Sequence, residues 1–271
     1  MPELPEVEEV RRSLEPHVLN VPIAAVRINR PDFITPPTAP LQDLVGRRIV
    51  STFRHGKKLF CIAADDQTLV IHLGMSGRID CVPSSAPLPA HTHVIFTLAS
   101  GTDVRLVDPR RFGGLWHYPT SALAKRTELQ NLGKDALQLH AADLAHWRKT
   151  RGRLKQRLLS QKDVAGLGNI YVDESLWMSQ LHPLQRVDRI SPESIEKLVA
   201  AIHLVLERSI NAGGTTLRDY RNVADQPGQF ARQLQAYGHG GKPCLRCATL
   251  MSETSVAGRT TVFCRICQRR R

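Results

Sequence analysis

The strongest constraint on the fold lies in the last 31 residues, where four cysteines stand in two closely spaced pairs. Cys244-x2-Cys247 and Cys264-x2-Cys267 are separated by sixteen residues. This spacing is typical of a site in which four thiolates close a tetrahedral shell around one structural Zn²⁺. Two redox-active thiol pairs are the alternative, but the flanking sequence has no thioredoxin-like context. The pattern therefore predicts a zinc-stapled module over residues 241–271.

The charge of this module indicates its partner. From Gly241 onward there are seven Lys or Arg residues and one acidic residue, Glu253, so its formal charge is 7 − 1 = +6. The whole chain of 271 residues carries +12 and has a pI of about 9.9. Such a balance favours a polyanion, above all nucleic acid. An anionic membrane is the weaker alternative, because no basic amphipathic helix is visible.

The remaining composition indicates a globular protein with room for two domains. No apolar run approaches the ~18 residues that a membrane helix requires. The acidic start predicts that no signal peptide is present. Six cysteines without a secretory signal argue for metal binding or free thiols. Cys61 and Cys81 have no metal spacing, and we expect both to be core or incidental thiols.

Two kinds of periodicity divide the chain. Residues 21–120 contain short alternating apolar runs separated by polar turns, which predict an antiparallel sandwich or flattened barrel. Residues 121–210 are predicted to be helical. The prediction is clearest over 193–210, where apolar residues recur at helical spacing. We expect the domain change near 121–140.

The N-terminus, Met1-Pro-Glu-Leu-Pro-Glu, combines a nucleophile with acid–base groups. Pro2 is small enough to favour removal of Met1, which leaves a secondary amine that titrates far below a lysine amine. Such an amine attacks an aldehyde-like carbon and forms an iminium, an electron sink of the Schiff-base kind. Glu3 and Glu6 lie close by and can move protons. If Met1 were retained, the Pro2 nitrogen would be an amide and could not react.

A helix is predicted directly after these residues. Pro5 suits a first helical turn, and Val7, Val10 and Leu14 form one apolar stripe. This helix would hold Pro2 and Glu3 at its start, against a core. Taken alone, the same residues also fit an ordinary acidic helix cap.

Several motifs in sequence order make the chain resemble the formamidopyrimidine-DNA glycosylase family, and the resemblance covers essentially the whole chain. Each motif is weak by itself, but chance does not explain all of them in this order. They are Pro2-Glu-Leu-Pro-Glu-Val-Glu8, His72-Leu-Gly-Met-Ser-Gly77, Asp108-Pro-Arg-Arg-Phe-Gly113, Gly166-Leu-Gly-Asn-Ile-Tyr171, Gly213-Gly-Thr-Thr216 and the four cysteines.

The resemblance implies a base-excision enzyme that removes oxidised purines such as 8-oxoguanine and formamidopyrimidines and then cuts the strand by β,δ-elimination. Pro2 is implied to be the nucleophile, Glu3 the proton-transfer residue and Glu6 a support behind the site. Lys57 is implied to bind near the target phosphate and base. It is preferred over Lys58 because the following Leu-Phe aligns with the strand.

Further residues are implied to hold the DNA. Asn169 of the helix–two-turn–helix would contact phosphate. Arg259 of the zinc finger would do the same, and it is counted with the catalytic residues. Met75, Arg110 and Phe112 would fill the duplex gap. The remaining DNA contacts implied are Arg218 and His91. Some members of the family have lysine at the position of Arg218. The run His91-Thr-His93 departs from the family's usual histidine-acidic-histidine pattern.

The implied architecture is α+β. It comprises an N-terminal antiparallel β-sandwich with a leading helix (1–130), a helix–two-turn–helix domain (131–240) and a β-hairpin zinc finger (241–271). The implied cofactor is one structural Zn²⁺. The implied partner is double-stranded DNA containing oxidised purines, bound by a monomer in a bacterial-type cytoplasm and nucleoid, with no membrane association.

Two alternatives remain open. The sister glycosylase for oxidised pyrimidines shares this architecture, although the Leu4-Pro5-Glu6-Val7 start disfavours it. A non-catalytic zinc module that only binds DNA would make Pro2 and Glu3 dispensable. The residues of loop 217–229 do not specify which lesion is preferred.

Overall fold

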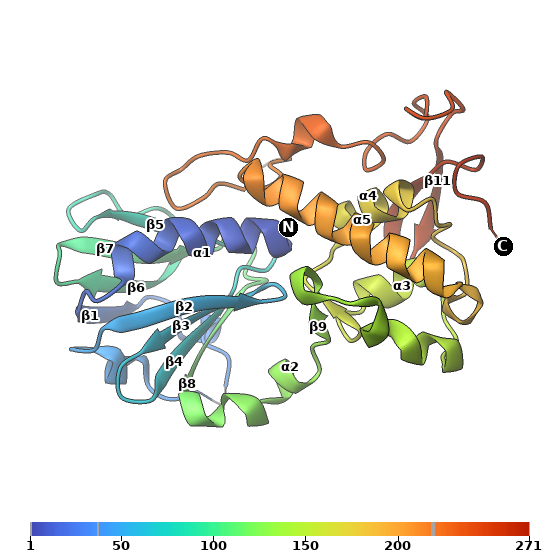
Figure 1. The fold of residues 1–271 in the computed structure, drawn as a ribbon. Helices are drawn as coiled ribbons and strands as arrows, with labels where there is room; N and C mark the ends of the chain where they lie inside the picture. The colour runs from blue at the N-terminus through green and yellow to red at the C-terminus, as the bar shows by residue number, and fades with distance from the viewer. Residues whose placement is uncertain (1, 37, 218–219, 271) are drawn as a thin grey trace. The chain divides into compact units, whose positions relative to one another are not determined.

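The computed structural model describes residues 2–36, 38–217 and 220–270 (Figure 1). These residues form two compact units, one within 1–130 and 212–229, the other within 131–211 and 230–271. Segment 212–229, which the predicted boundaries assign to the helical domain, thus folds with the N-terminal unit. None of the described helices is long and apolar enough to cross a membrane.

The first unit contains two four-stranded antiparallel sheets, ordered β1-β6-β7-β5 and β2-β3-β4-β8. The strands are β1 (Ile23–Ile28), β2 (Ile49–His55), β3 (Lys58–Ala63), β4 (Gln67–His72), β5 (Arg78–Pro83), β6 (Thr92–Leu98), β7 (Thr102–Val107) and β8 (Gly114–Pro119). Short helices complete the unit: η1 (Pro31–Phe33), η2 (Leu41–Leu44), η3 (Thr120–Lys125) and α2 (Thr127–Gln130). The predicted antiparallel β architecture is confirmed.

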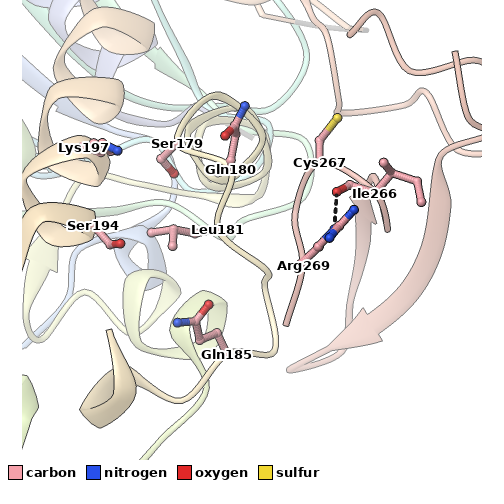
Figure 2. Close-up of a pocket in the computed structure, with 9 residues that line it drawn as sticks. All are labelled: Ser179, Gln180, Leu181, Gln185, Ser194, Lys197, Ile266, Cys267 and Arg269. Atoms are coloured by element: carbon pink, nitrogen blue, oxygen red, sulfur yellow. Dashed lines mark hydrogen bonds between the residues drawn. The ribbon is translucent and has the colours of Figure 1, made fainter. Parts of the chain in front are cut away.

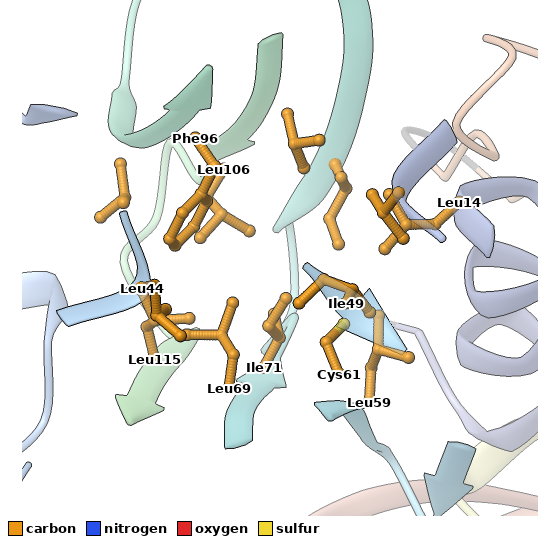
Figure 3. Close-up of a cluster of buried hydrophobic side chains, with 14 of the residues drawn as sticks. Leu14, Leu44, Ile49, Leu59, Cys61, Leu69, Ile71, Phe96, Leu106 and Leu115 are labelled. Atoms are coloured by element: carbon orange, nitrogen blue, oxygen red, sulfur yellow. The ribbon is translucent and has the colours of Figure 1, made fainter. Parts of the chain in front are cut away.

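The core of this unit lies between the two sheets (Figure 3). Alternate side chains of strand β3 point to opposite faces of the sheet. Leu59, Cys61 and Ala63 enter the core between the sheets, whereas Phe60 joins a second apolar cluster with Val70. Each buried large aliphatic or aromatic side chain contributes roughly 1.5–3 kcal/mol relative to exposure. Burial raises the pKa of Cys61 to about 12, as expected of an inert core thiol.

Helix α1 (Leu4–Val18) covers one end of the sandwich and supplies its stripe to the same core. Val7, Val10 and Leu14 are each 1% exposed, as predicted from their spacing. Pro5 lies in the first turn, where no backbone donor is required. The apolar stripe therefore fixes the start of the helix against the sandwich.

The second unit is mainly helical and ends in the zinc hairpin. Its α-helices are α3 (Leu154–Leu159), α4 (Asn169–Met178) and α5 (Pro192–Asn211), and α5 matches the predicted periodicity. Strands β9 (Lys134–Asp135) and β10 (Val164–Ala165) pair in parallel, and β11 (Ser252–Val256) and β12 (Arg259–Phe263) form the hairpin. The 3-10 helices are η4 (Ala136–Gln138), η5 (Ala141–Lys149), η6 (Val187–Arg189) and η7 (Phe230–Gln233).

Candidate active site and nucleic-acid interface

Pro2 and Glu3 are buried at the N-terminal end of α1. Glu3 is the N-cap residue and is only 2% exposed. Its backbone N–H donates to Glu6 Oε2 at 2.8 Å, one half of a reciprocal capping box. The N-terminus of a helix carries partial positive charge, because its first N–H groups have no partner within the helix. The local fold thus holds Pro2 next to a buried carboxylate.

The other oxygen of Glu6 bonds to a distant part of the chain. The backbone N–H of Thr215 donates to Glu6 Oε1 at 2.7 Å. This approach requires Gly214, which has φ +87°, because a Cβ there would lie 3.2 Å from Glu6 Oε1 and 3.0 Å from the Tyr220 ring. Glu6 therefore joins the helix cap to segment 212–229.

Two loops of the sandwich are locked together by Asp108, which is fully buried. Its carboxylate accepts from Ser76 Oγ at 2.6 Å, from the Gly113 N–H at 2.8 Å and from the Arg110 N–H at 3.3 Å. The backbones also touch: a Cβ on Gly74 would lie 2.3 Å from the Phe112 carbonyl carbon. Loops 73–77 and 108–113 therefore form one rigid platform.

This platform presents an apolar side chain to solvent. Phe112 is 54% exposed, although phenylalanine is among the residue types most often buried. The Arg110 guanidinium carbon lies 5.0 Å from its ring centroid, within cation–π range. Met75 is half-buried on the adjoining loop. The platform thus carries an exposed apolar ring beside the planar guanidinium of Arg110.

Lys57 lies in the turn between β2 and β3 and is half-buried. Lys58 Nζ sits over the Trp116 ring at 4.2 Å, so this side chain packs on the sheet. The pKa of His72 is lowered to about 4, mainly by burial and further by the positive charges of Lys58 and Lys57. His72 is therefore a neutral imidazole at neutral pH, beside a lysine-bearing turn.

His91 is exposed, with φ +63°. Its carbonyl accepts from the Asp108 N–H at 3.1 Å, which ties it to loop 108–113. It lines a cavity of about 470 Å³ together with Arg30 and Arg111. Two arginines and a histidine at one cavity suit an anion. Arg218 lies outside the described residues.

In the second unit, the start of α4 and the zinc hairpin are bonded together. Asn169 Nδ2 donates to the Thr260 carbonyl at 2.9 Å, and the fully buried Lys155 Nζ donates to the same carbonyl at 3.2 Å and to Asp173 at 2.6 Å. Burial raises the pKa of Asp173 to about 6, against the lowering effect of Lys155. Arg259, exposed at the start of β12, is therefore held near Asn169.

The four cysteines meet as their spacing predicts. All four sulfurs lie within 4.8 Å of one another, with Cys244–Cys267 at 4.0 Å and Cys247–Cys264 at 3.5 Å. A tetrahedral Zn²⁺ with Zn–S bonds of about 2.3 Å requires sulfurs about 3.8 Å apart, so the set fits this ion. The chain thus has one structural zinc site. Cys267 also lines a cavity of about 450 Å³ together with Arg269 and Lys197. Figure 2 shows these lining residues.

Comparison with known proteins identifies the family. Residues 1–115 match the formamidopyrimidine-DNA glycosylase N-terminal domain, residues 132–221 the formamidopyrimidine-DNA glycosylase H2TH domain, and residues 241–270 the zinc finger found in FPG and IleRS. The chain belongs to the formamidopyrimidine-DNA glycosylase family. It is accordingly a bifunctional DNA glycosylase and AP lyase of base-excision repair.

Relatives match this glycosylase over its whole length. Formamidopyrimidine-DNA glycosylases of Photobacterium profundum and Teredinibacter turnerae are each 38% identical to it, over 99% of this chain and 100% of theirs. A Lactococcus lactis FPG mutant, solved with Fapy-dG-containing DNA, is 33% identical with TM-score 0.92, covering 99% of this chain and all of its own. The Lactococcus lactis Fpg complex with abasic-site DNA has TM-score 0.92 at 32% identity.

Some residues of this glycosylase escaped sequence reasoning. Asp108 and Thr215 stood inside quoted motifs without a role, and the Lys155–Asp173 pair was not singled out. The available signal was weak: an aspartate before proline usually caps a turn. Only the folded chain shows Asp108 to be buried with several donors.

Proposed function

We propose that this glycosylase removes oxidised purines, including 8-oxoguanine and formamidopyrimidines, from duplex DNA through a Schiff base at Pro2. The observation that carries the proposal is the buried N-terminal cap, where Pro2 and Glu3 lie at the positive end of α1 and Glu6 fixes the Glu3 backbone. The nitrogen nucleophile and a carboxylate that can move protons are thereby held together.

The proposed chemistry starts from a nucleotide flipped out of the duplex, because C1′ cannot be reached inside the stack. After Met1 is removed, the Pro2 nitrogen attacks C1′, and the bond to the damaged base breaks with its electron pair leaving on the base. The departing base takes up the proton that the Pro2 nitrogen loses. Glu3 protonates the sugar ring oxygen, which opens the ring to an iminium. The iminium acidifies C2′–H, and Glu3, now a carboxylate, takes this proton while the C3′–O bond breaks and the 3′ phosphate leaves. Loss of a C4′ proton in a second elimination then expels the 5′ phosphate.

The proposed DNA contacts are those that the family resemblance implies, and the exposure of Phe112 and Arg259 supports two of them. Met75 and Phe112 fill the gap that the flipped nucleotide leaves, as wedging side chains do in bent DNA. Lys57 binds the phosphate of the target nucleotide, and His91, Arg218, Asn169 and Arg259 bind other phosphates. We further propose that the enzyme acts as a monomer in the bacterial cytoplasm, where its DNA substrate lies.

Borohydride trapping tests this proposal. Sodium borohydride should reduce the iminium and link the protein to 8-oxoguanine duplex through Pro2, as mapped by mass spectrometry of the crosslinked peptide. Intact-mass measurement should show that Met1 is absent. A crosslink at Lys57 would transfer the role of nucleophile, and preferential trapping on thymine glycol duplex would favour the pyrimidine-lesion alternative.

Arg110 is expected to read the base left behind on the opposite strand. Its guanidinium only donates, and an orphaned cytosine offers two acceptors, O2 and N3, whereas adenine offers fewer. Wild type should therefore excise 8-oxoguanine faster opposite cytosine than opposite adenine. Arg110→Ala should shrink that ratio, while Phe112→Ala slows excision opposite both bases. Equal ratios in wild type and Arg110→Ala would rule out base reading.

Arg259→Ala is expected to weaken binding to undamaged duplex and to reduce its salt dependence by about one phosphate contact. The physical reason is that each neutralised phosphate releases counterions on binding. Binding isotherms over a series of salt concentrations measure the slope, and Arg27→Ala, on strand β1, serves as the control. An unchanged slope for Arg259→Ala would show that this side chain does not touch the backbone of DNA.

A further inference from the structure

Arg54 is a buried arginine near the end of strand β2 that bonds to two different parts of the first unit. Its side chain is 5% exposed, and its Nε lies 3.4 Å from Glu8 Oε2 on helix α1. Its Nη1 donates to the Gly56 carbonyl at 2.9 Å, in the turn between β2 and β3. A guanidinium presents several donors in a fixed plane, so one side chain can hold both partners. Arg54 thus connects the helix that carries the catalytic cap to the turn that carries Lys57.

The turn between β2 and β3 consists of Gly56 and Lys57 alone. His55 pairs with Lys58 at the end of the ladder, and Gly56 has φ +58°. A two-residue hairpin favours glycine at such a position, because glycine takes up a positive φ without steric cost. The same freedom leaves the Gly56–Lys57 peptide less restricted by the strands on either side. The bond from Arg54 to the Gly56 carbonyl restricts the orientation of that peptide, and with it the backbone of Lys57.

The other end of this connection is Glu8, which lies in the second turn of α1 and is 8% exposed. Burial opposes its ionisation, but hydrogen bonds from Arg11 and Arg12 and the charge of Arg54 hold the pKa of the Glu8 carboxyl below its ordinary value. Glu8 Oε1 accepts from Arg11 Nη2 at 3.0 Å and from Arg12 Nε at 2.9 Å. A buried charge is tolerated where partners surround it in this way. Glu8 is therefore a fixed negative group on α1 to which Arg54 is tied.

We propose that Arg54 is a positioning residue that, held by Glu8, sets the place of Lys57 relative to the catalytic cap. The inference rests on the proposed function, in which Lys57 binds the phosphate of the target nucleotide. That nucleotide must meet the Pro2 nitrogen at C1′ and Lys57 at its phosphate together, so the placement of the turn relative to α1 affects the rate. A buried ion pair often adds little to stability, and its expected contribution here is to this geometry.

A double-mutant cycle in single-turnover excision of 8-oxoguanine opposite cytosine tests this role. Arg54→Met removes every donor but keeps an apolar stem. It is expected to lower the rate at saturating enzyme by about 10- to 100-fold, the scale of a misplacement of about 1 Å. The enzyme concentration that gives half of that rate should change less than about threefold, because many other phosphate contacts hold the duplex. In a Lys57→Ala background, Arg54→Met should lower the rate less than about twofold, because the lysine that it positions is absent.

Two further variants separate positioning from stability. Arg12 is 52% exposed and bonds to Glu8 within α1, so Arg12→Gln should excise 8-oxoguanine within about twofold of wild type. Glu8→Gln removes the charge that holds Arg54. It should reproduce part of the loss, and that loss should also disappear in the Lys57→Ala background. Arg54→Met leaves Glu8 bonded to Arg11 and Arg12, so the carboxylate stays paired and we expect the protein to fold, as circular dichroism would show.

The outcomes distinguish this inference from the function on which it rests. Equal rate losses from Arg54→Met with and without Lys57, or full activity of the folded Arg54→Met protein, would overturn the positioning role. Where Arg54→Met does not fold, the Glu8→Gln cycle decides in the same way. Failure of the wild type to excise 8-oxoguanine, or full activity of Lys57→Ala, would instead contradict the proposed function.

Discussion

Glu3→Gln is expected to lower single-turnover excision of 8-oxoguanine by about 10²- to 10⁴-fold, the range that a positioned acid or base contributes. Glu3 is 2% exposed at the start of α1, and glutamine has nearly the same size. The amide can still accept a hydrogen bond within the capping box, but it cannot transfer a proton to the sugar oxygen. DNA affinity should therefore change little, while the chemical step is lost.

A matched variant makes this result specific. Glu15→Gln removes the same charge near the other end of α1, where Glu15 pairs with Arg11 at 2.8 Å. It should excise 8-oxoguanine within a few-fold of wild type, because it is distant from the cap along the helix. Excision by Glu3→Gln at the wild-type rate, with an unchanged borohydride crosslink, would remove Glu3 from the mechanism.

Cys244→Ser or Cys267→Ser is expected to abolish stoichiometric zinc binding and to weaken binding to duplex DNA by more than about tenfold. Zinc bound to such modules supplies roughly 10–16 kcal/mol in isolated peptides, so its loss unfolds the unit it staples. The unfolded hairpin would no longer hold Arg259, nor the other cations that this segment adds to the electrostatic attraction. Elemental analysis and equilibrium binding measure the two effects.

The control is Cys81→Ser, which changes a half-buried thiol of strand β5 that lies outside the metal cluster. It should keep one zinc per chain and bind DNA as wild type does. The hairpin is also bonded to α4, through the Val262 N–H to Asp173 at 3.1 Å and Arg246 to the Trp177 carbonyl at 2.6 Å. We expect that those bonds cannot hold the hairpin without the metal. A protein that contains no zinc and still excises the lesion would show that they can.

Local patterns were enough to predict several parts of this protein. The stripe of Val7, Val10 and Leu14 predicted α1, and alternating runs predicted β2, β3 and β4, because burial of one face follows from the period of each element. The cysteine spacing predicted the zinc cluster, since two short knuckles bring four thiolates together with little help from the remaining fold. The role of Phe112 came only from resemblance, because nothing local distinguishes an exposed phenylalanine from a core one.

The sequence by itself therefore determined the elements, the zinc module and the position of Pro2, the proposed nucleophile, next to a carboxylate. Only the tertiary structure decided how the cap is held. Thr215 reaches Glu6 across 209 residues, and Asp108 joins two loops through Ser76 and the Gly113 N–H. The physical reason is that a buried carboxylate is tolerated only where the fold supplies donors. Many of those donors are backbone N–H groups, which every residue except proline carries. The pattern of side chains therefore does not reveal which N–H groups will lie beside a buried carboxylate in the folded chain.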